Sequence, residues 1–146
     1  MSYEIITSLQ NPKIKNILRL EEKASERKSQ NLIVIEGTKE LELAIKGNVD
    51  FQMLFFCKDL ISERDFEKTF QKYLSKTQVF EVSKQVFEKI AYRENIFGVV
   101  ALAKSRFLTL DKLQLSPSPL ILVLENVEKP GNLGAILRTA DAAGVD

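Results

Sequence analysis

The chain has 146 residues, of which 45% are hydrophobic and 28% are charged, and its formal net charge is +1. This length allows one ordinary domain, or one small domain and part of another. The near-neutral charge excludes a general attraction to polyanions, so any nucleic-acid surface must come from local clusters of Lys and Arg. Histidine is absent, which excludes Ser-His-Asp and Cys-His catalysis and argues against a metal site of the zinc type.

The single cysteine, Cys57, excludes an intrachain disulfide and is expected to be a buried, inert strand thiol. The longest apolar run, residues 96–103, is too short to cross a membrane. The first residues do not form a secretory signal, so a cytoplasmic location without a membrane partner is expected.

The first predicted element is a helix that runs from Asn11-Pro12 to about Lys28. Asn is a good N-cap, and Pro is preorganised for the first helical position. The helix is expected to bury Ile14, Ile17 and Leu18. Beside this apolar face, basic residues recur every fourth position: Lys15, Arg19, Lys23 and Arg27. Acidic residues are interleaved with them, and on pattern alone such a stripe is more often a solvated face than a binding site.

Strands and helices alternate after this helix. Short apolar runs rich in β-branched or aromatic residues predict strands at 32–36, 51–57, 78–82 and 97–103. Apolar residues at helical spacing predict the helices between them, with Thr38, Ser62 and Ser83 as N-caps. The order predicts an α/β fold over residues 1–104, a small three-layer α/β/α sandwich with a largely parallel or mixed sheet.

The character of the chain changes after residue 104. Residues 105–119 contain Ser-Pro-Ser-Pro, which prevents helix formation, and are predicted to be a linker. Residues 120–146 then predict a buried strand at 120–124, a polar loop, and a helix that ends near Gly144. A single β-α unit cannot cover its strand, so this segment is expected to be the start of a truncated second domain. The unpaired strand is expected to join a second copy or to be poorly ordered.

The last predicted helix carries a candidate ligand site. Gly131, Gly134, Ala135 and Arg138 fall on one face. Helical side chains lean toward the N-terminus, so Arg138 should lie over Gly134 and Ala135. Helix-start amides favour an anion, and Asn132 should either cap the helix or present its amide. The pattern is consistent with a site that binds a phosphate or a ribose. Such spacing more often belongs to an ordinary capped helix with a solvated arginine.

Residues 124–145 resemble the first motif of the SpoU/TrmH family of RNA 2′-O-ribose methyltransferases. The residues in family positions are Pro130, Asn132, Gly134, Arg138, Thr139, Ala140 and Gly144. Upstream, residues 8–15, 35–37 and 97–101 resemble the family's substrate-binding N-terminal domain. The resemblance implies a fold like that of the ribosomal-protein-like kink-turn RNA binders, and a ribosomal or transfer RNA substrate. It also implies a homodimer, formed through the catalytic domain.

The resemblance implies catalytic roles for Arg138 and Asn132. A guanidinium stays charged, so Arg138 is expected to stabilise the developing 2′-alkoxide or to hold the adjacent phosphate, while Asn132 shapes the site. The methyl donor implied is S-adenosylmethionine, held by later motifs that this sequence lacks. No cofactor-binding residues are therefore expected in these 146 residues, which should be inactive alone.

The resemblance also favours the interpretation that some of the basic residues bind RNA. The candidates are Asn11, Lys13, Lys15, Arg19 and, in the turn Glu36-Gly37-Thr38-Lys39, Lys39. Two other functions remain open at this point. The chain could be a stand-alone RNA-binding or ribosome-associated adaptor in which residues 120–146 form a docking arm, or a small-ligand phosphate-binding protein.

Overall fold

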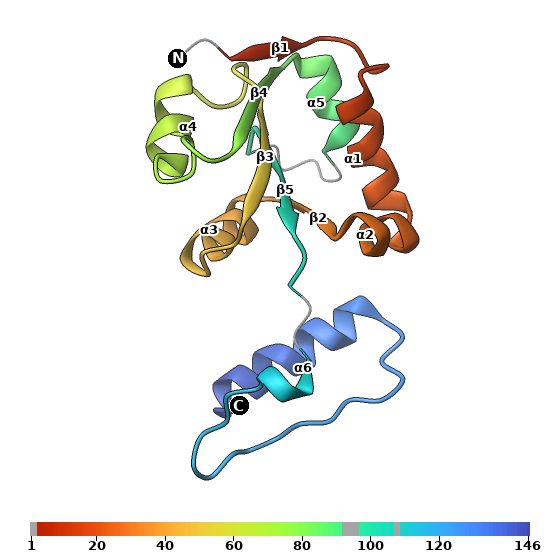
Figure 1. Ribbon diagram of the computed structural model, residues 1–146, viewed down its shortest axis with the longest axis vertical. Helices are drawn as coiled ribbons and strands as arrows, with labels where there is room; N and C mark the ends of the chain where they lie inside the picture. Colours follow the sequence, from red (N-terminus) through yellow and green to blue (C-terminus); the bar gives the residue numbers. More distant parts are fainter. Residues whose placement is uncertain (1–2, 92–96, 107–108) are drawn as a thin grey trace. The chain divides into compact units, whose positions relative to one another are not determined.

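A mixed five-stranded sheet with the order β1-β4-β3-β5-β2 is the centre of the first of two units (Figure 1). The first unit is Met1–Arg106 and the second unit is Phe107–Asp146. The computed structural model describes residues 3–91, 97–106 and 109–146, without the side chain of Pro130.

The strands of the first unit are β1 (Glu4–Ile6), β2 (Leu32–Glu36), β3 (Phe51–Phe56), β4 (Gln78–Val82) and β5 (Val99–Lys104). Strands β1, β4 and β3 are parallel, while β5 runs antiparallel to both β3 and β2. The predicted alternation and the mixed sheet are confirmed. Strand β1 was missed, because three residues with one buried side chain are too short to give a periodic pattern.

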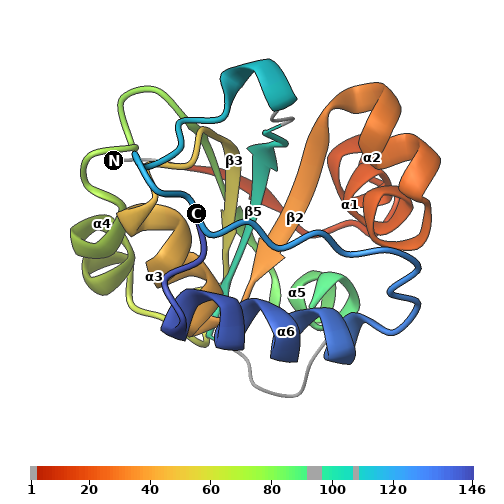
Figure 2. The same cartoon turned by 90° about the horizontal axis from the view of Figure 1, so that it is seen from below.

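Helices cover both faces of this sheet (Figure 2). They are α1 (Pro12–Glu22), α2 (Ala24–Gln30), α3 (Thr38–Lys46), α4 (Glu63–Phe70) and α5 (Lys84–Ile90). Three expected N-caps are present: Asn11 Oδ1, Ser62 Oγ and Ser83 Oγ accept backbone N–H bonds at 2.9, 3.1 and 3.4 Å. The prediction that Thr38 caps α3 is wrong. Gly37 occupies that position with φ of 91°, a conformation that glycine adopts without strain.

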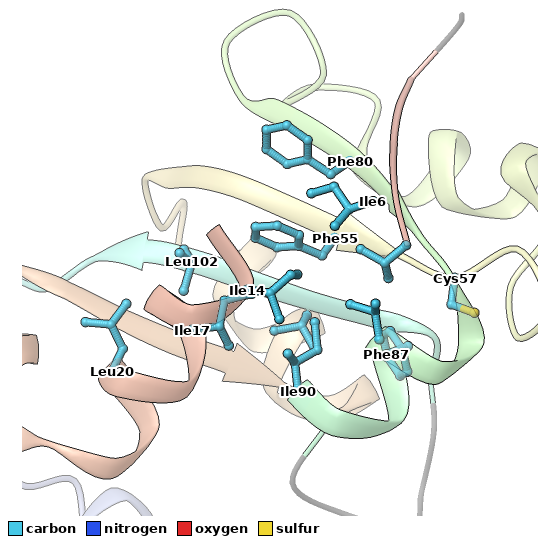
Figure 3. Close-up of a cluster of buried hydrophobic side chains, with 13 residues drawn as sticks. Ile6, Ile14, Ile17, Leu20, Phe55, Cys57, Phe80, Phe87, Ile90 and Leu102 are labelled. Carbon is cyan, nitrogen blue, oxygen red and sulfur yellow. The ribbon is translucent and has the colours of Figure 1, made fainter. Parts of the chain in front are cut away.

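Two hydrophobic clusters separate the layers. Helices α1 and α5 pack on one face, where Ile14, Ile17 and Ile90 meet Phe55 (Figure 3). Helices α3 and α4 pack on the other face, in the cluster that holds Phe66 and Phe70. Strand β5 contributes alternate residues to the two clusters, as the two-residue period of a strand requires. The predicted three-layer sandwich is therefore confirmed, and Cys57 is buried as expected.

The predicted continuous helix over residues 12–28 is wrong. Helix α1 ends at Glu22, and Lys23 has an extended backbone (φ −118°, ψ 112°) before α2 starts. The chain turns here because Arg27 folds back: its Nη1 donates to the carbonyls of Leu20 and Glu21 at 2.6 and 3.0 Å. These bonds satisfy carbonyls that a helix end leaves without intrahelical partners. The expected basic stripe is therefore interrupted after Arg19.

The second unit contains a short 3-10 helix, η1 (Leu110–Lys112), and α6 (Pro130–Ala142). The expected strand at residues 120–124 is wrong for this structure, which assigns no strand among the described residues of the second unit. A strand needs a neighbour for its backbone groups. Here Leu120 instead pairs with Asp146, donating to its carboxylate and accepting from its N–H, both at 3.0 Å. Across the parts of the chain that the structure describes, no helix is long and apolar enough to cross a membrane.

Candidate RNA-binding and catalytic residues

Helix α6 begins after Lys129, whose extended backbone (φ −96°, ψ 121°) makes it the N-cap residue. Asn132 is the third residue of the helix, and its backbone N–H donates to the Lys129 carbonyl at 3.0 Å. The expectation that Asn132 caps the helix is therefore wrong. Its side chain is exposed, so the other expectation, an amide presented to solvent, is the one that agrees with the structure.

Arg138 has the predicted orientation. Its side chain is exposed and leans back over Gly134: a methyl group placed on Gly134 would lie 3.8 Å from Arg138 Nη1. One turn earlier, a methyl group on Gly131 would have no neighbour within 4 Å. The small residues thus leave space on this face, and a guanidinium in that space can reach an anionic oxygen.

Asn132 and Arg138 do not share this face. Six residues correspond to about one and two-thirds turns of an α-helix, so the two side chains leave α6 in different directions. The helix alone therefore does not bring both groups to one atom of a ligand.

A second feature of this unit is an apolar cleft of about 520 Å³ between residues 120–122 and α6. The α6 side contributes Ala135, Ile136 and Ala140. Among the described residues that line the cleft, Thr139 alone has a polar side chain. S-adenosylmethionine carries an amino acid and a ribose that need several hydrogen-bond partners, so these residues do not fit that cofactor.

Four of the five predicted RNA-binding residues lie at the start of the chain. Asn11 uses its side chain to cap α1, accepting from the Lys13 N–H at 2.9 Å. Lys13 Nζ lies 3.6 Å from Glu4 Oε1 and 4.7 Å from the centre of the Phe80 ring. Lys15 and Arg19 are exposed on α1, beside its buried face. The structure therefore places all four along one helix and its first turn.

Lys39 lies in another layer. It is the second residue of α3, it is exposed, and α3 packs on the sheet face opposite to α1. Strand β2, like β3, runs antiparallel to β5, so its carboxyl end lies at the same edge of the sheet as the ends of β1 and β4. Helices α1 and α3 both start from that edge. Ligands of α/β sheets often bind at the carboxyl ends of the strands.

A cleft beside β2 was not predicted from the sequence. It has a volume of about 520 Å³ and is lined by Leu20, Glu21, Arg27, Ile33, Val34 and Glu36. Burial, the nearby carboxylate of Glu36 and that of Glu22 raise the pKa of Glu21 to about 7. Glu21 was missed because its environment depends on the turn at Lys23 and on a strand distant in the sequence.

The family model of the MRM3-like substrate binding domain matches residues 11–101. An uncharacterized tRNA/rRNA methyltransferase from Synechocystis sp. is 37% identical over 150 residues, which cover 97% of this chain and 50% of that protein. The 23S rRNA (guanosine(2553)-2′-O)-methyltransferase RlmP of Bacillus subtilis is 28% identical over 141 residues, covering 97% of this chain and 52% of that protein.

The similar solved structures are also RNA methyltransferases. A crystal structure of an RNA 2′-O ribose methyltransferase has a TM-score of 0.73 and 38% identity, covering 97% of this chain and 53% of that one. An AdoMet-bound rRNA methyltransferase from Sinorhizobium meliloti has a TM-score of 0.81 and 29% identity, and the match covers 98% of this chain and 52% of that one. All these similar proteins are methyltransferases that act on RNA. The chain belongs to the family of MRM3-like substrate-binding domains, and its homologues are SpoU/TrmH rRNA 2′-O-methyltransferases. It spans about half the length of the relatives that it matches.

Proposed function

We propose that this chain is the substrate-binding part, and the start of the catalytic part, of an RNA 2′-O-ribose methyltransferase that uses S-adenosylmethionine. The substrate would be ribosomal RNA, with transfer RNA as the second choice. The observation that carries the proposal is the family match over residues 11–101, which lies within the first unit. In this proposal residues 1–104 bind RNA, residues 105–119 are a linker, and residues 120–146 begin the methyltransferase domain.

The proposed RNA surface consists of α1 and the edge of the sheet from which it starts. Lys15 and Arg19 are exposed on one helix and can each neutralise a phosphate. Lys13 and Asn11 would fix the position of the RNA at the start of α1, and Lys39 would contact it from α3. Contacts of this kind set affinity and orientation, and carry little sequence information.

The proposed catalytic residue is Arg138, with Asn132 shaping the site. The 2′-hydroxyl of the target ribose must lose its proton, and negative charge develops on its oxygen. Arg138 stabilises that charge, because a guanidinium stays protonated and the small residues around it leave room for the ribose. The residues that line the cleft beside α6 do not fit the methyl donor, and in this proposal the donor is bound by the part of the relatives' length that these 146 residues do not cover. The 146 residues alone would be inactive, and the complete enzyme would be a cytoplasmic homodimer.

Binding of an rRNA fragment tests the proposal for the first unit. Lys15→Ala and Arg19→Ala should each weaken binding at all sequences alike, and each should reduce the slope of log affinity against log salt by about one. Lys68→Ala is the matched control, because Lys68 is an exposed lysine on α4, in the other layer. If the chain does not bind rRNA above a DNA duplex control, or if Lys68→Ala weakens binding as much, the proposed surface is wrong.

Turnover tests the role of Arg138, in an enzyme that joins this chain to the catalytic half of its relatives. Arg138→Ala should reduce kcat by about a hundredfold or more, the usual effect of losing one group that stabilises an oxyanion. Arg138→Lys keeps the charge and should recover part of the rate. A kcat within twofold of the unchanged enzyme for Arg138→Ala would remove this residue from catalysis.

A further inference from the structure

The cleft beside β2 combines three kinds of surface in one place. Val34 of β2 gives it an apolar wall on the α1 side of the sheet, and the charged residues Glu21, Arg27 and Glu36 line it as well. Its volume of about 520 Å³ is within the range of about 300–1,000 Å³ that is usual for small-ligand pockets. Neither the family match nor the proposed phosphate contacts assigns a function to it.

One charged group of the cleft, Arg27, is held by hydrogen bonds. Arg27 Nη1 is bound to the carbonyls of Leu20 and Glu21, so the guanidinium is held in place. A planar cation held in this way is a surface on which a nucleobase can stack. Glu21 is half-buried, and the charged groups facing it are Glu22 on its own helix, Arg27 on α2 and Glu36 on β2.

Two neighbouring carboxylates disfavour a phosphate in this cleft and favour a ligand that offers N–H groups. Guanine offers N1–H and N2–H side by side, a spacing that matches the two oxygens of one carboxylate. Adenine and cytosine offer one donor beside an acceptor on the same edge, which does not match an ionised carboxylate. The apolar wall at Val34 suits one face of a base, which favours apolar contact over water.

We propose that this cleft binds an unpaired guanine of the substrate RNA, with the Glu21 carboxylate accepting from N1–H and N2–H and Arg27 stacked on the base. The inference rests on the proposed RNA binding, and it adds sequence recognition to a surface that otherwise contacts phosphates. Glu36 assists by adding negative potential to the cleft. The ionised form of Glu21 is the one that binds, so guanine recognition should strengthen as pH rises through about 7.

The test measures affinities of the 146-residue chain for three labelled RNA pentanucleotides, UUGUU, UUIUU and UUAUU. One bidentate contact discriminates by about tenfold, so the guanine oligonucleotide should bind about tenfold more tightly than the adenine one at about pH 8. Inosine, which lacks the N2 amine, should fall between them. The preference should shrink at about pH 6, where Glu21 is mostly protonated.

Glu21→Gln should abolish the guanine preference, while Glu42→Gln, the same change at an exposed position of α3, should leave it intact. Equal affinities for the three oligonucleotides, absent binding of all three, or a guanine preference that survives in Glu21→Gln would each overturn the cleft assignment. Binding of an rRNA fragment in the same preparation separates the two proposals. If the rRNA fragment binds without a guanine effect, only the cleft proposal fails; if it does not bind, the proposed function fails as well.

Discussion

Replacing Glu21 by Gln is expected to change how the stability of the first unit depends on pH. The pKa of Glu21 is raised from the ordinary value of 4.5 to about 7, by burial, by Glu36 and by Glu22. The folded chain therefore holds this proton more tightly than the unfolded chain does. The stability from this group is fully present below about pH 4.5 and is lost as the pH rises through about 7.

The size of the effect follows from the same shift. A full shift from 4.5 to about 7 corresponds to about 3 kcal/mol at high pH. Glu21 is only half-buried, and solvent screens its charge, so about 1–2 kcal/mol is the expected cost. Glutamine has the same shape and no charge. Glu21→Gln should therefore match the unchanged chain near pH 4.5 and exceed its stability by about 1–2 kcal/mol above pH 8.

Urea unfolding followed by far-ultraviolet circular dichroism measures this difference, since the chain contains no Trp for fluorescence. Glu42→Gln is the control: it removes one carboxylate from an exposed position and should not change the pH dependence. A gain for Glu21→Gln that is the same at every pH would mean that the substitution acts through packing. Absence of any gain at high pH would show that the carboxylate is well solvated, and the reasoning about the cleft would fail with it.

Three other substitutions test how the first unit is held together. Gly98→Ala should lower the free energy of unfolding by about 1–3 kcal/mol, because Gly98 has φ of 80° and an added methyl would lie 2.9 Å from Leu60 Cβ. A Tm equal to that of the unchanged chain would contradict this prediction. Arg27→Ala should lower the free energy of unfolding by about 1–3 kcal/mol, because it leaves carbonyls of α1 without their charged donor. Arg27→Lys should recover only part of this stability. A loss below about 0.5 kcal/mol for Arg27→Ala would show that water replaces the guanidinium. Ser62→Ala should lower the free energy of unfolding by about 1 kcal/mol, because it removes the N-cap bond from Asp65 N. Ser62→Thr keeps a hydroxyl that can accept from Asp65 N and donate to the Asp65 carboxylate, and should be nearly neutral in a denaturant titration.

Sequence patterns between neighbouring residues were sufficient to predict most helices and strands of the first unit. The alternation of strand and helix patterns after α1, and the caps Ser62 and Ser83, depend on neighbouring residues, and they were predicted correctly. The break at Lys23 was not predictable in this way, because every residue around it is compatible with a helix. Side chains distant along the chain hold the turn. Arg27 donates to the carbonyls at the end of α1, and the side chains of Asn16 and Gln30 exchange two hydrogen bonds of 2.8 Å that hold α2 against α1.

In the candidate catalytic site, too, local features were predictable and features that depend on the rest of the fold were not. The position of Arg138 over Gly134 was predictable, because side chains lean toward the N-terminus along any helix. The role of Asn132 depended on the residue at which α6 starts, and helix ends are uncertain by one or two residues from sequence. Residues 120–124 have the pattern of a strand, but a strand also needs a partner, and a sequence pattern does not show whether one is present.

The turn at Lys23 also decides which charges belong to the proposed RNA surface. A continuous helix would have set Lys15, Arg19, Lys23 and Arg27 in one stripe, able to neutralise about four phosphates and to give a salt slope near three for single strands. In the structure Arg27 is withdrawn to bind the carbonyls of α1 and to line the cleft. The contribution of α1 should then be nearer half of that slope, from Lys15 and Arg19. The fold thus removes Arg27 from the proposed phosphate surface and places it among the carboxylates of the cleft. In our proposal it stacks there on the base that Glu21 distinguishes, so a charge that would have raised affinity for any RNA instead supports the recognition of one base.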